Sequence, residues 1–435
     1  MSIPPVKVIG AGLAGCEAAY QLAKRGVPVL LYEMKPLKFS PAHKLGTFSE
    51  LVCSNSLRSD NLTNAVGLLK EELRLLGSLI MECADKTRIP AGGALAVDRE
   101  GFSRLVTERI RENSLITVVS EEVKAIPEGP CVIATGPLTE GELLEDIERV
   151  TGTTLHFHDA AAPIVEKSSL DMTKVFESSR YDRGSDYLNC PMNAEEYFRF
   201  VRELLNAETA PLHEFETPKV FEGCMPVEAM AKRGELTLAY GPLKPVGLID
   251  PRTGKMPFAV VQLRRDNEAG TLYNIVGFQT NLKFPEQRRV FGLIPGLGHA
   301  EFVRYGVMHR NSYLESPKKL SPCYELYERK ELFFAGQITG VEGYVESASS
   351  GLVAGAALAR RMMGEEPREL TAITAIGALG RYVSCYNGSD FQPMNVTFGI
   401  MEGLEKAPRN KRERYAAIAE RSLAHIRETV ENGGI

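Results

Sequence analysis

Two of the eight cysteines in this chain stand among small or polar residues, which are surroundings that suit a reactive thiol. Cys53 lies in ELVCSNSLRSD, just before serine, asparagine and arginine residues, and Cys224 lies in FEGCMPVEAMAKRG, before a Lys-Arg pair. A thiol reacts as its thiolate, which nearby cations and hydrogen-bond donors favour near neutral pH. Both cysteines are therefore candidates for a nucleophile or a base. The alternative is that each is a small buried side chain, the commonest fate of a cysteine outside a disulfide.

The cysteines as a set show no pattern that would bind a metal or form a disulfide framework. No two of them are arranged as CxxC, and their spacing is irregular. Cys16, inside a predicted helix, and Cys131, inside a predicted strand, are expected in the core. This usage predicts no metal site and favours a reducing compartment, the cytoplasm.

A glycine-rich loop near the start of the chain predicts a nucleotide site. Residues 10–15 read GAGLAG, a GxGxxG motif between a predicted strand over 6–9 and a helix that ends at about Lys24. A second predicted strand ends at Glu33, which completes a βαβ unit. Such glycines let a diphosphate approach the helix N-terminus, and an acid after the second strand accepts hydrogen bonds from a ribose. The motif therefore predicts a dinucleotide with free ribose hydroxyls, FAD or NAD.

Two later segments favour FAD over NAD. FFAGQITGVEGY, ending at Tyr344, leads into a small-residue helix, and VIATG ends at Gly136. Flavoproteins use such segments to bring backbone N–H groups near the flavin, and Tyr344 is a candidate to stack on base, folate or flavin. The alternative is that both are only tight turns between a strand and a helix. The predicted FAD contacts are Gly10, Ala11, Gly12, Leu13, Ala14, Gly15, Glu33, Thr135, Gly136, Gly336, Gln337, Gly340, Gly343 and Tyr344.

The order of elements predicts an α/β fold, an FAD-binding Rossmann-like domain of the glutathione-reductase type with an inserted α+β domain. Further helices are predicted over 62–76, with Asp60 or Asn61 as the N-cap, and near 100–112. Further strands are predicted over 115–119 and at CVIATG.

The texture of the sequence changes between about 140 and 325. Short predicted strands, TLAYG, AVVQL and TLYNIVGFQT, are separated by proline and glycine, and helices are scarcer. We therefore expect residues 1–140 and 326–435 to form a discontinuous FAD-binding domain, and residues 141–325 to form the inserted, substrate-binding domain. The charged tail is predicted to be a terminal helix.

Composition and charge exclude several classes of protein. The 435 residues are 44% hydrophobic and 25% charged, which is typical of globular rather than disordered or fibrous proteins. With a formal net charge of -5, a nucleic acid would have to bind a local basic patch. No stretch reaches the length of a membrane span, and the first residues do not resemble a signal peptide, so we expect no membrane partner.

Longer stretches of the chain resemble one group of flavoproteins. LFFAGQITGVEGYVESASSGLVAG, together with GAGLAG, resembles the flavoproteins that modify tRNA uridines. ELVCSNSLRSD, PAGGALAVDR, DAAAPIVE, FEGCMPVEAMAKRG, YGPLKPVGL and RYGVMHRN resemble the folate- and FAD-dependent tRNA (uracil-5-)-methyltransferase family specifically. The resemblance runs from residue 6 to about residue 400.

The resemblance implies a transferase that takes part in tRNA processing. The methyl carbon would come from 5,10-methylenetetrahydrofolate, the electrons from NADH or NADPH through FAD, and the acceptor would be C5 of the T-loop uridine at tRNA position 54. A thiolate that adds to C6 of uracil makes C5 nucleophilic, which is why such chemistry calls for cysteine. The family's roles fall on Cys224 as this nucleophile and on Cys53 as the residue that helps remove the C5 proton beside the flavin.

A tRNA substrate also requires basic residues at the surface. The candidate phosphate contacts are Lys232, Arg233, Arg264, Arg265, Arg288, Arg289, Lys318, Lys319 and the tail from Arg409 to Arg414. No second GxGxxG motif is present, so we expect the nicotinamide to dock transiently at the flavin. The alternatives are flavin-dependent modification of another tRNA uridine, a flavin oxidoreductase that acts on a small metabolite, and a flavin-bearing RNA-binding protein without catalysis.

Overall fold

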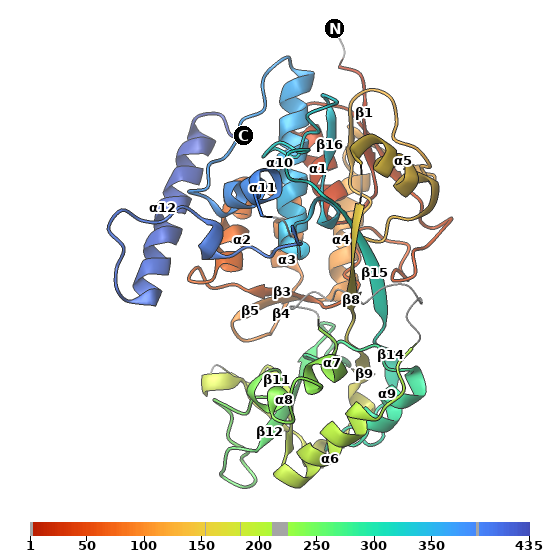
Figure 1. Cartoon of the computed structure of the whole chain (residues 1–435), viewed down its shortest axis with the longest axis vertical. Coiled ribbons are helices and arrows are strands. Elements are labelled where there is room, and N and C mark those ends of the chain that lie inside the picture. The colour runs from red at the N-terminus through yellow and green to blue at the C-terminus, as the bar shows by residue number, and fades with distance from the viewer. Residues whose placement is uncertain (1–2, 153, 183, 211–224, 389–390) are drawn as a thin grey trace.

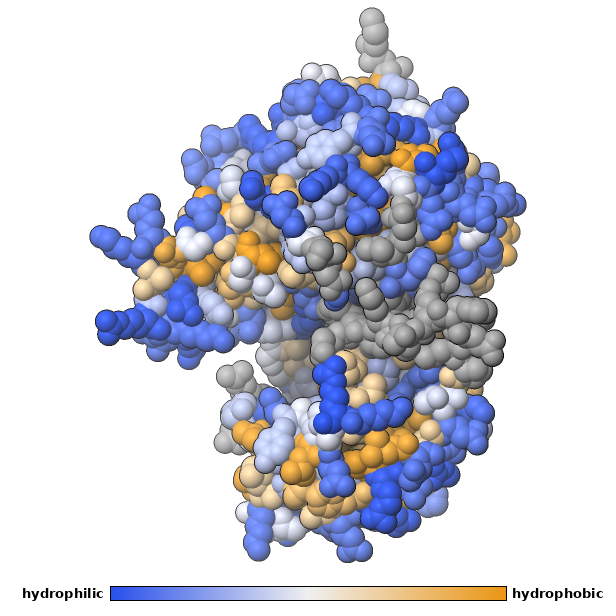
Figure 2. Space-filling view, viewed as in Figure 1, coloured by the Kyte–Doolittle hydropathy of each residue, from blue (hydrophilic) through white to orange (hydrophobic). Residues whose placement is uncertain are grey.

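The computed structural model of this chain describes residues 3–152, 154–182, 184–210, 225–388 and 391–435. Two parts are visible in Figure 1, an upper part that contains both ends of the chain and a lower part built from its middle. Each part has its own large cluster of buried apolar side chains. In Figure 2 the outline is notched on the left where the two parts meet.

The upper part is organised around a parallel sheet of five strands in the order β16-β7-β1-β2-β6. Its strands are almost continuously apolar, which is typical of a parallel sheet covered on both faces. The strands are β1 Val6–Ile9, β2 Val29–Glu33, β6 Ile116–Ser120, β7 Cys131–Ile133 and β16 Leu332–Phe334. The predicted βαβ unit at the start of the chain is confirmed, and so is the burial of Cys16 and Cys131.

Eight α-helices belong to the described residues of the upper part. Two of them, α1 and α10, pack closely because α10 carries glycines: a Cβ on Gly351 would lie 2.2 Å from the carbonyl oxygen of Ala14. The helices are α1 Leu13–Lys24, α2 Ala65–Leu75, α3 Leu79–Lys86, α4 Arg99–Arg111, α5 Gly141–Thr151, α10 Tyr344–Met362, α11 Ala375–Cys385 and α12 Lys411–Glu431.

The predicted N-cap of α2 is wrong. The Asn61 side chain accepts a hydrogen bond from the Thr63 amide at 2.9 Å, which forms a turn ahead of the helix, so that Asn64 is the N-cap. Short polar side chains compete for backbone donors in this way, and such turns shift a helix start by a few residues.

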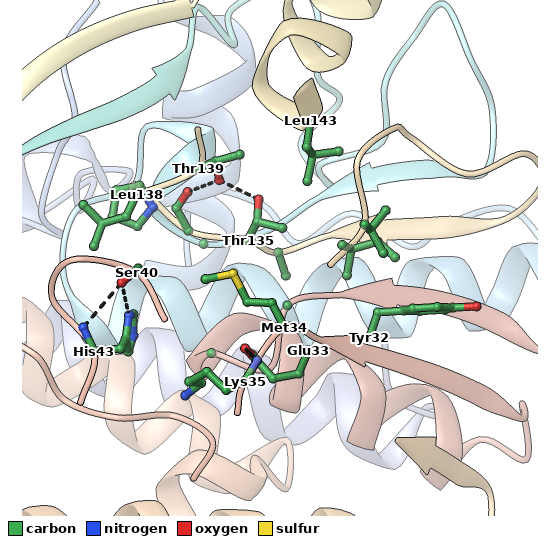
Figure 3. A pocket seen from close by; sticks show the side chains of 18 of the residues that line it. Tyr32, Glu33, Met34, Lys35, Ser40, His43, Thr135, Leu138, Thr139 and Leu143 are labelled. Atoms are coloured by element: carbon green, nitrogen blue, oxygen red, sulfur yellow. Dashed lines mark hydrogen bonds between the residues drawn. The ribbon is translucent and has the colours of Figure 1, made fainter. Parts of the chain in front are cut away.

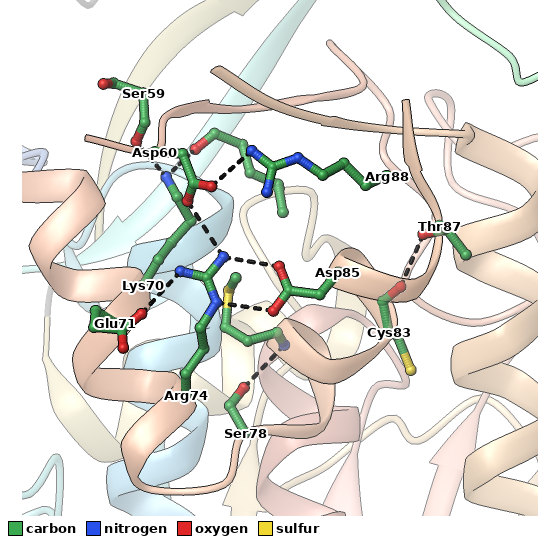
Figure 4. A network of polar contacts seen from close by, with 12 residues as sticks. Ser59, Asp60, Lys70, Glu71, Arg74, Ser78, Cys83, Asp85, Thr87 and Arg88 are labelled. Carbon is green, nitrogen blue, oxygen red and sulfur yellow. Dashed lines mark hydrogen bonds and ion pairs between the residues drawn. The ribbon is translucent and has the colours of Figure 1, made fainter. Parts of the chain in front are cut away.

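A small sheet and a network of charges hold the segment that follows Cys53. Strands β3 (Ser56–Ser59), β5 (Ala94–Val97) and β4 (Arg88–Ile89) form this sheet. Figure 4 shows Arg74 of α2 between Asp85 of α3 and Asp60, which also pairs with Arg88. The buried ammonium of Lys70 donates to two carbonyl oxygens of β3, at 2.9 and 2.6 Å. The polypeptide on the C-terminal side of Cys53 is therefore anchored to two helices.

The lower part is built on an antiparallel sheet in the order β10-β11-β12-β13-β9-β14. An antiparallel pair, β8 (Thr154–Ala160) and β15 (Met308–Leu314), runs between the two parts in Figure 1. The remaining strands are β9 Ile164–Glu166, β10 Phe176–Glu177, β11 Tyr187–Met192, β12 Ala259–Arg265, β13 Leu272–Ile275 and β14 Phe302–Arg304. The helices are α6 Ala194–Leu205, α7 Val227–Ala231, α8 Thr237–Tyr240 and α9 Phe284–Phe291.

One predicted strand of the lower part is wrong. TLAYG forms the short helix α8, Thr237–Tyr240, with Gly241 as its C-cap. Its two middle residues, Leu238 and Ala239, are both buried, whereas Tyr240 is 82% exposed. Burial of adjacent residues suits a helical turn and not a half-buried strand, whose side chains alternate between two faces.

Residues on both sides of the predicted domain boundaries belong to the core of the upper part. Leu143 and Ile147 of α5 belong to the core of the upper part, as do Leu314 and Leu320. The division at residues 140 and 326 therefore stays a prediction.

Candidate active site

A cavity of about 400 Å³ lies at the carboxyl ends of the five strands of the parallel sheet, the edge at which such sheets bind ligands (Figure 3). Residues that follow β1, β2, β6, β7 and β16 line it, together with the loop after β2. The lining falls in residues 9–14, 32–52, 121–124, 134–143 and 336–347.

The start of α1 presents unpaired backbone donors to this cavity. Gly12 is the N-cap, no side chain caps the helix, and its first turn carries no acid. A Cβ on Gly12 would meet no protein atom within 4 Å, so the wall is open there. Gly10 has a φ of +98°, and a Cβ on Gly15 would lie 1.8 Å from the Gly10 carbonyl oxygen. An uncapped N-terminus in a glycine cradle has the donors and the space that a diphosphate requires.

Glu33 lies at the end of β2 with both carboxylate oxygens held by the backbone. One oxygen accepts the amide of Ala11 at 2.9 Å and the other accepts the amide of Lys35 at 3.0 Å. The carboxylate is thus fixed at the cavity wall, and its remaining lone pairs can accept hydrogen bonds from a ribose.

The two late glycine segments supply the opposite wall. In the loop after β7, the hydroxyl of Thr139 lies 2.7 Å from that of Thr135 and 2.8 Å from the carbonyl oxygen of Gly136. After β16, the amide of Gly336 donates to the Ser350 hydroxyl at 2.7 Å, which ties this turn to α10. Figure 3 shows Thr135 and Thr139 above Glu33 across the cavity.

The predicted FAD contacts divide into two groups. One group lines the cavity: Gly10, Gly12, Leu13, Ala14, Glu33, Thr135, Gly136, Gly336, Gln337 and Tyr344. The others, Ala11, Gly15, Gly340 and Gly343, do not line it. Gly340 has left-handed backbone against the ring of Phe391, and Gly343 is the N-cap of α10, so these residues shape the turns. The assignment of contacts itself stays a prediction.

The loop after β2 adds lining residues that no sequence pattern predicts. Ser40 and His43 line the cavity and lie 2.6 Å apart, Oγ to Nδ1, as Figure 3 shows. Burial, and then the positive charge of Lys35, lower the pKa of His43. Glu50 accepts the amides of two loop residues. These residues lie in SPAHKLGTFSE, residues 40–50, which has neither periodicity nor a motif that would have marked them.

Tyr344 holds the backbone of Cys53 next to the cavity, although Cys53 itself does not line it. The hydroxyl oxygen of Tyr344 accepts the amide of Cys53 at 2.8 Å and that of Ser54 at 3.2 Å, and Tyr344 and Val52 both line the cavity. Burial, and then the charge of Cys53, raise the pKa of this phenol, so Tyr344 is neutral near pH 7. The thiol of Cys53 lies 3.7 Å from the carbonyl oxygen of Ala160 in β8. Cys224 lies outside the residues that the structure describes.

Two arginines do not have the surroundings that the sequence suggested. The charge of Arg58 is not directed at the Cys53 thiol, because Arg58 forms an ion pair with the buried Glu346. Arg264 is not a phosphate contact, because it is buried and donates to Ser54 and Asn55. The other predicted phosphate contacts are exposed or partly exposed, and their assignment stays a prediction.

The described residues offer neither a metal cluster nor a membrane-spanning helix. No cluster of three or more His, Cys, Asp or Glu side chains that could hold a metal ion was found among them. No helix among them is long and apolar enough to cross a membrane.

Comparison with known proteins gives close relatives. Residues 5–366 match the family described as glucose inhibited division protein A. The chain is 61% identical over 428 residues to methylenetetrahydrofolate--tRNA-(uracil-5-)-methyltransferase TrmFO of Acetivibrio thermocellus, which covers 98% of each chain. It is 59% identical over 432 residues to the protein of the same name from Bacillus cereus (strain AH187), which covers 99% of this chain and all of the other.

Solved structures give the same fold. GidA of Aquifex aeolicus superposes with a TM-score of 0.68 at 16% identity, covering 98% of this chain and 73% of that one. The fold class predicted from the sequence is confirmed. The chain belongs to the glucose inhibited division protein A family and, within it, to the group of methylenetetrahydrofolate--tRNA-(uracil-5-)-methyltransferases TrmFO that it matches along nearly its whole length.

Proposed function

We propose that this chain methylates C5 of a uridine in tRNA, with the carbon from 5,10-methylenetetrahydrofolate and FAD as its cofactor. The observation that carries the proposal is the shared wall between the nucleotide cavity and the Cys53 loop, which Tyr344 joins through two hydrogen bonds. The names of relatives about 60% identical over the whole chain support the same reaction.

The cavity fits FAD on the evidence of its own residues. The open N-terminus of α1 at Gly12 suits the diphosphate, and the fixed carboxylate of Glu33 suits the adenosine ribose. The turns at Gly136 and Gly336 and the ring of Tyr344 would face the remainder of the molecule. When bound, the flavin supplies the electron and one-carbon transfers that amino-acid side chains cannot perform.

The protein's own groups would carry the proton and nucleophile steps. The thiolate of Cys224 adds to C6 of uracil, which makes C5 an enolate carbon able to attack the carbon donor. The C5 proton then passes to the sulfur of Cys53. Expulsion of Cys224 from C6 restores the ring double bond and releases the product. These roles rest on the resemblance to the family and on the place of Cys53 beside the cavity.

Transfer of label tests this function. The purified chain is incubated with tRNA, [methylene-14C]tetrahydrofolate, FAD and NADH or NADPH, and the label in tRNA is counted. We expect incorporation that needs FAD and a reduced nicotinamide and is lost in Cys224→Ala. Oxidation of nicotinamide without labelling of tRNA would instead identify an oxidoreductase that acts on a small metabolite.

The position of the label tests the finer assignment. We propose the T-loop uridine at position 54, in the cytoplasm, where tRNA is processed. A tRNA transcript with cytidine at position 54 should take up no label. Labelling at another uridine would support the second candidate function, flavin-dependent modification of a different tRNA uridine. Only the likeness to GidA favours that function.

A further inference from the structure

We propose that Arg264 and Arg304 of the lower part hold Cys53 as a thiolate. Both are positioning residues that act on Cys53 across the boundary between the two parts of the chain. What the thiolate is used for rests on the proposed function, whereas its formation can be measured without tRNA or folate.

Arg264 of β12 is fixed beside the Cys53 loop by hydrogen bonds. Its Nη2 donates to the Ser54 hydroxyl at 2.7 Å, and its Nε donates to the side-chain oxygen of Asn55 at 3.1 Å. Asn55 is anchored in turn, because its amide nitrogen donates to the carbonyl oxygens of Val97 and Arg265 at 3.0 and 2.8 Å. The guanidinium therefore has a defined place next to the residues that follow Cys53.

Arg304 of β14 brings a second buried cation to the loop after β2, which lines the same cavity. Its Nη2 donates to the carbonyl oxygen of Ala42 in the upper part at 3.3 Å. Arg264 and Arg304 are each only 8% exposed, and neither forms an ion pair among the residues that the structure describes. A third arginine, Arg99 of α4, is different, because Asp266 binds it in a two-pronged ion pair at 2.8 and 3.0 Å. Burial of two cations without carboxylate partners favours an anion nearby.

Four further titratable groups lie near Cys53 or the two arginines in the described part of the chain. Tyr344 is neutral, Asp266 is engaged by Arg99, and Glu50 is held by loop amides. Tyr187 lies beside Arg264.

Each unpaired arginine responds to the charge of Cys53. Burial lowers the pKa of Arg264, whereas Tyr187, Asp266 and, as the smallest contribution, an ionised Cys53 raise it against the effect of Arg99. Burial and Arg99 lower the pKa of Arg304, whereas Tyr344, Glu50 and, least of all, an ionised Cys53 raise it. The interaction is mutual, so both guanidinium groups favour the thiolate.

An ionised Cys53 suits the step assigned to it. Its proton leaves to solvent before the uridine binds, and the thiolate then has a vacant site for the C5 proton. After product release that proton returns to solvent, so the enzyme is restored without net change. A neutral thiol could not accept the proton.

Alkylation of the full-length, FAD-containing protein tests the proposal. The rate of iodoacetamide modification of Cys53 is measured against pH by peptide mass spectrometry, and the exposed Cys385 in the same digest serves as a reference for the reagent. We expect the wild-type Cys53 profile to have its midpoint at least one unit below the ordinary value of about 8.5. Arg264→Gln should raise it by about one unit, Arg304→Gln should act in the same direction, and Arg264→Lys should keep most of the effect.

Arg265→Gln is the matched control. Arg265 follows Arg264 on the same strand, so its side chain points to the opposite face, and its bond to Asn55 comes from the backbone. This variant and the Cys385 profile should show no shift.

Three results would overturn the proposal. The first is a wild-type midpoint at or above 8.5. The second is an equal shift of the midpoint in the Arg264→Gln and Arg265→Gln proteins. The third is an unchanged midpoint in both the Arg264→Gln and the Arg304→Gln proteins. If Arg264→Gln does not fold, the wild-type and Arg304→Gln profiles decide. A low midpoint in a protein that labels no tRNA leaves this inference standing and refutes the proposed function.

Discussion

Cys53 owes its surroundings to residues far from it in the chain. Tyr344 holds its amide, and Arg264 holds the two residues that follow. Hydrogen bonds to the amide of Cys53 and to the two residues after it fix the backbone of this loop relative to the cavity wall. Reactivity of Cys53 should therefore depend on groups that never touch its sulfur.

Tyr344→Phe tests the hold on the Cys53 loop. The ring is kept, but the amides of Cys53 and Ser54 lose their acceptor, and each unpaired buried donor costs about 1–3 kcal/mol. We expect FAD to be retained and label transfer to tRNA to fall at least tenfold, as measured by flavin absorbance and by the 14C assay. Full activity would show that the hydroxyl is dispensable, and loss of FAD would show that the loop also supports the cofactor.

Gly15→Ala tests the glycine loop. Its Cβ would lie 1.8 Å from the Gly10 carbonyl oxygen, so the loop must move away from the helix. We expect loss of bound FAD and a lower melting temperature. Gly403→Ala is the control, because a Cβ there meets nothing within 4 Å. Retention of FAD by Gly15→Ala, at the level of the control, would contradict this account of the loop.

The sequence predicts the parts of the site that have a local pattern. GAGLAG and Glu33 could be found because their spacing follows from one βαβ unit. Arg264 could not be recognised, because a buried arginine that holds a distant loop and an exposed one that binds phosphate look alike in sequence. Ser40 and His43 were missed for a similar reason, since only the fold brings their loop to the cavity.

Among the elements, Glu72 joins three helices. This buried carboxylate of α2 accepts the amides of Ala375 and Ile376 at the N-terminus of α11, at 2.7 and 2.9 Å, and the hydroxyl of Ser422 in α12. No arginine or lysine pairs with it among the described residues. Burial raises its pKa from 4.5 to about 7.

Glu72 should make the stability of the protein depend on pH. Its pKa is higher in the folded than in the unfolded state, so its contribution is complete below about pH 4.5 and is lost as pH rises through about 7, by up to about 3 kcal/mol. We expect the melting temperature of the wild type, relative to Glu72→Gln, to fall between pH 5 and pH 8. Glu71→Gln, the partly exposed neighbour, should show no such trend. A constant difference between wild type and Glu72→Gln would contradict the raised pKa.

Elements with strong periodicity were predicted well, and short ones were not. The strands and helix of the first βαβ unit match their predicted bounds, since each is apolar on the expected face. TLAYG forms a helix although its composition favours a strand, because five residues are too few to distinguish the two periods.

At the scale of the whole molecule, the net charge of -5 repels tRNA, which is a polyanion, and so opposes its binding. Binding of tRNA must then depend on local patches, of which the start of α12 is one candidate. Lys411 and Arg414 lie over the ring of Tyr415, at 5.5 and 5.7 Å from its centre, which presents both charges on one side of the helix.

Neutralising Lys411, Arg412 and Arg414 together with glutamine should weaken tRNA binding and make it less dependent on salt, because fewer counterions are released. The measurement is the dissociation constant at several salt concentrations. Lys86→Gln with Arg149→Gln, on exposed helix surfaces elsewhere, is the control. An unchanged salt slope in the triple variant would exclude this patch.

The structure of the FAD complex tests the central claim most directly. We predict that the diphosphate lies at the amides of Gly12 to Ala14, that the adenosine ribose lies at Glu33, and that the isoalloxazine lies against Tyr344 with Cys53 beside it. A diphosphate bound elsewhere, or a ring remote from Cys53, would contradict the account.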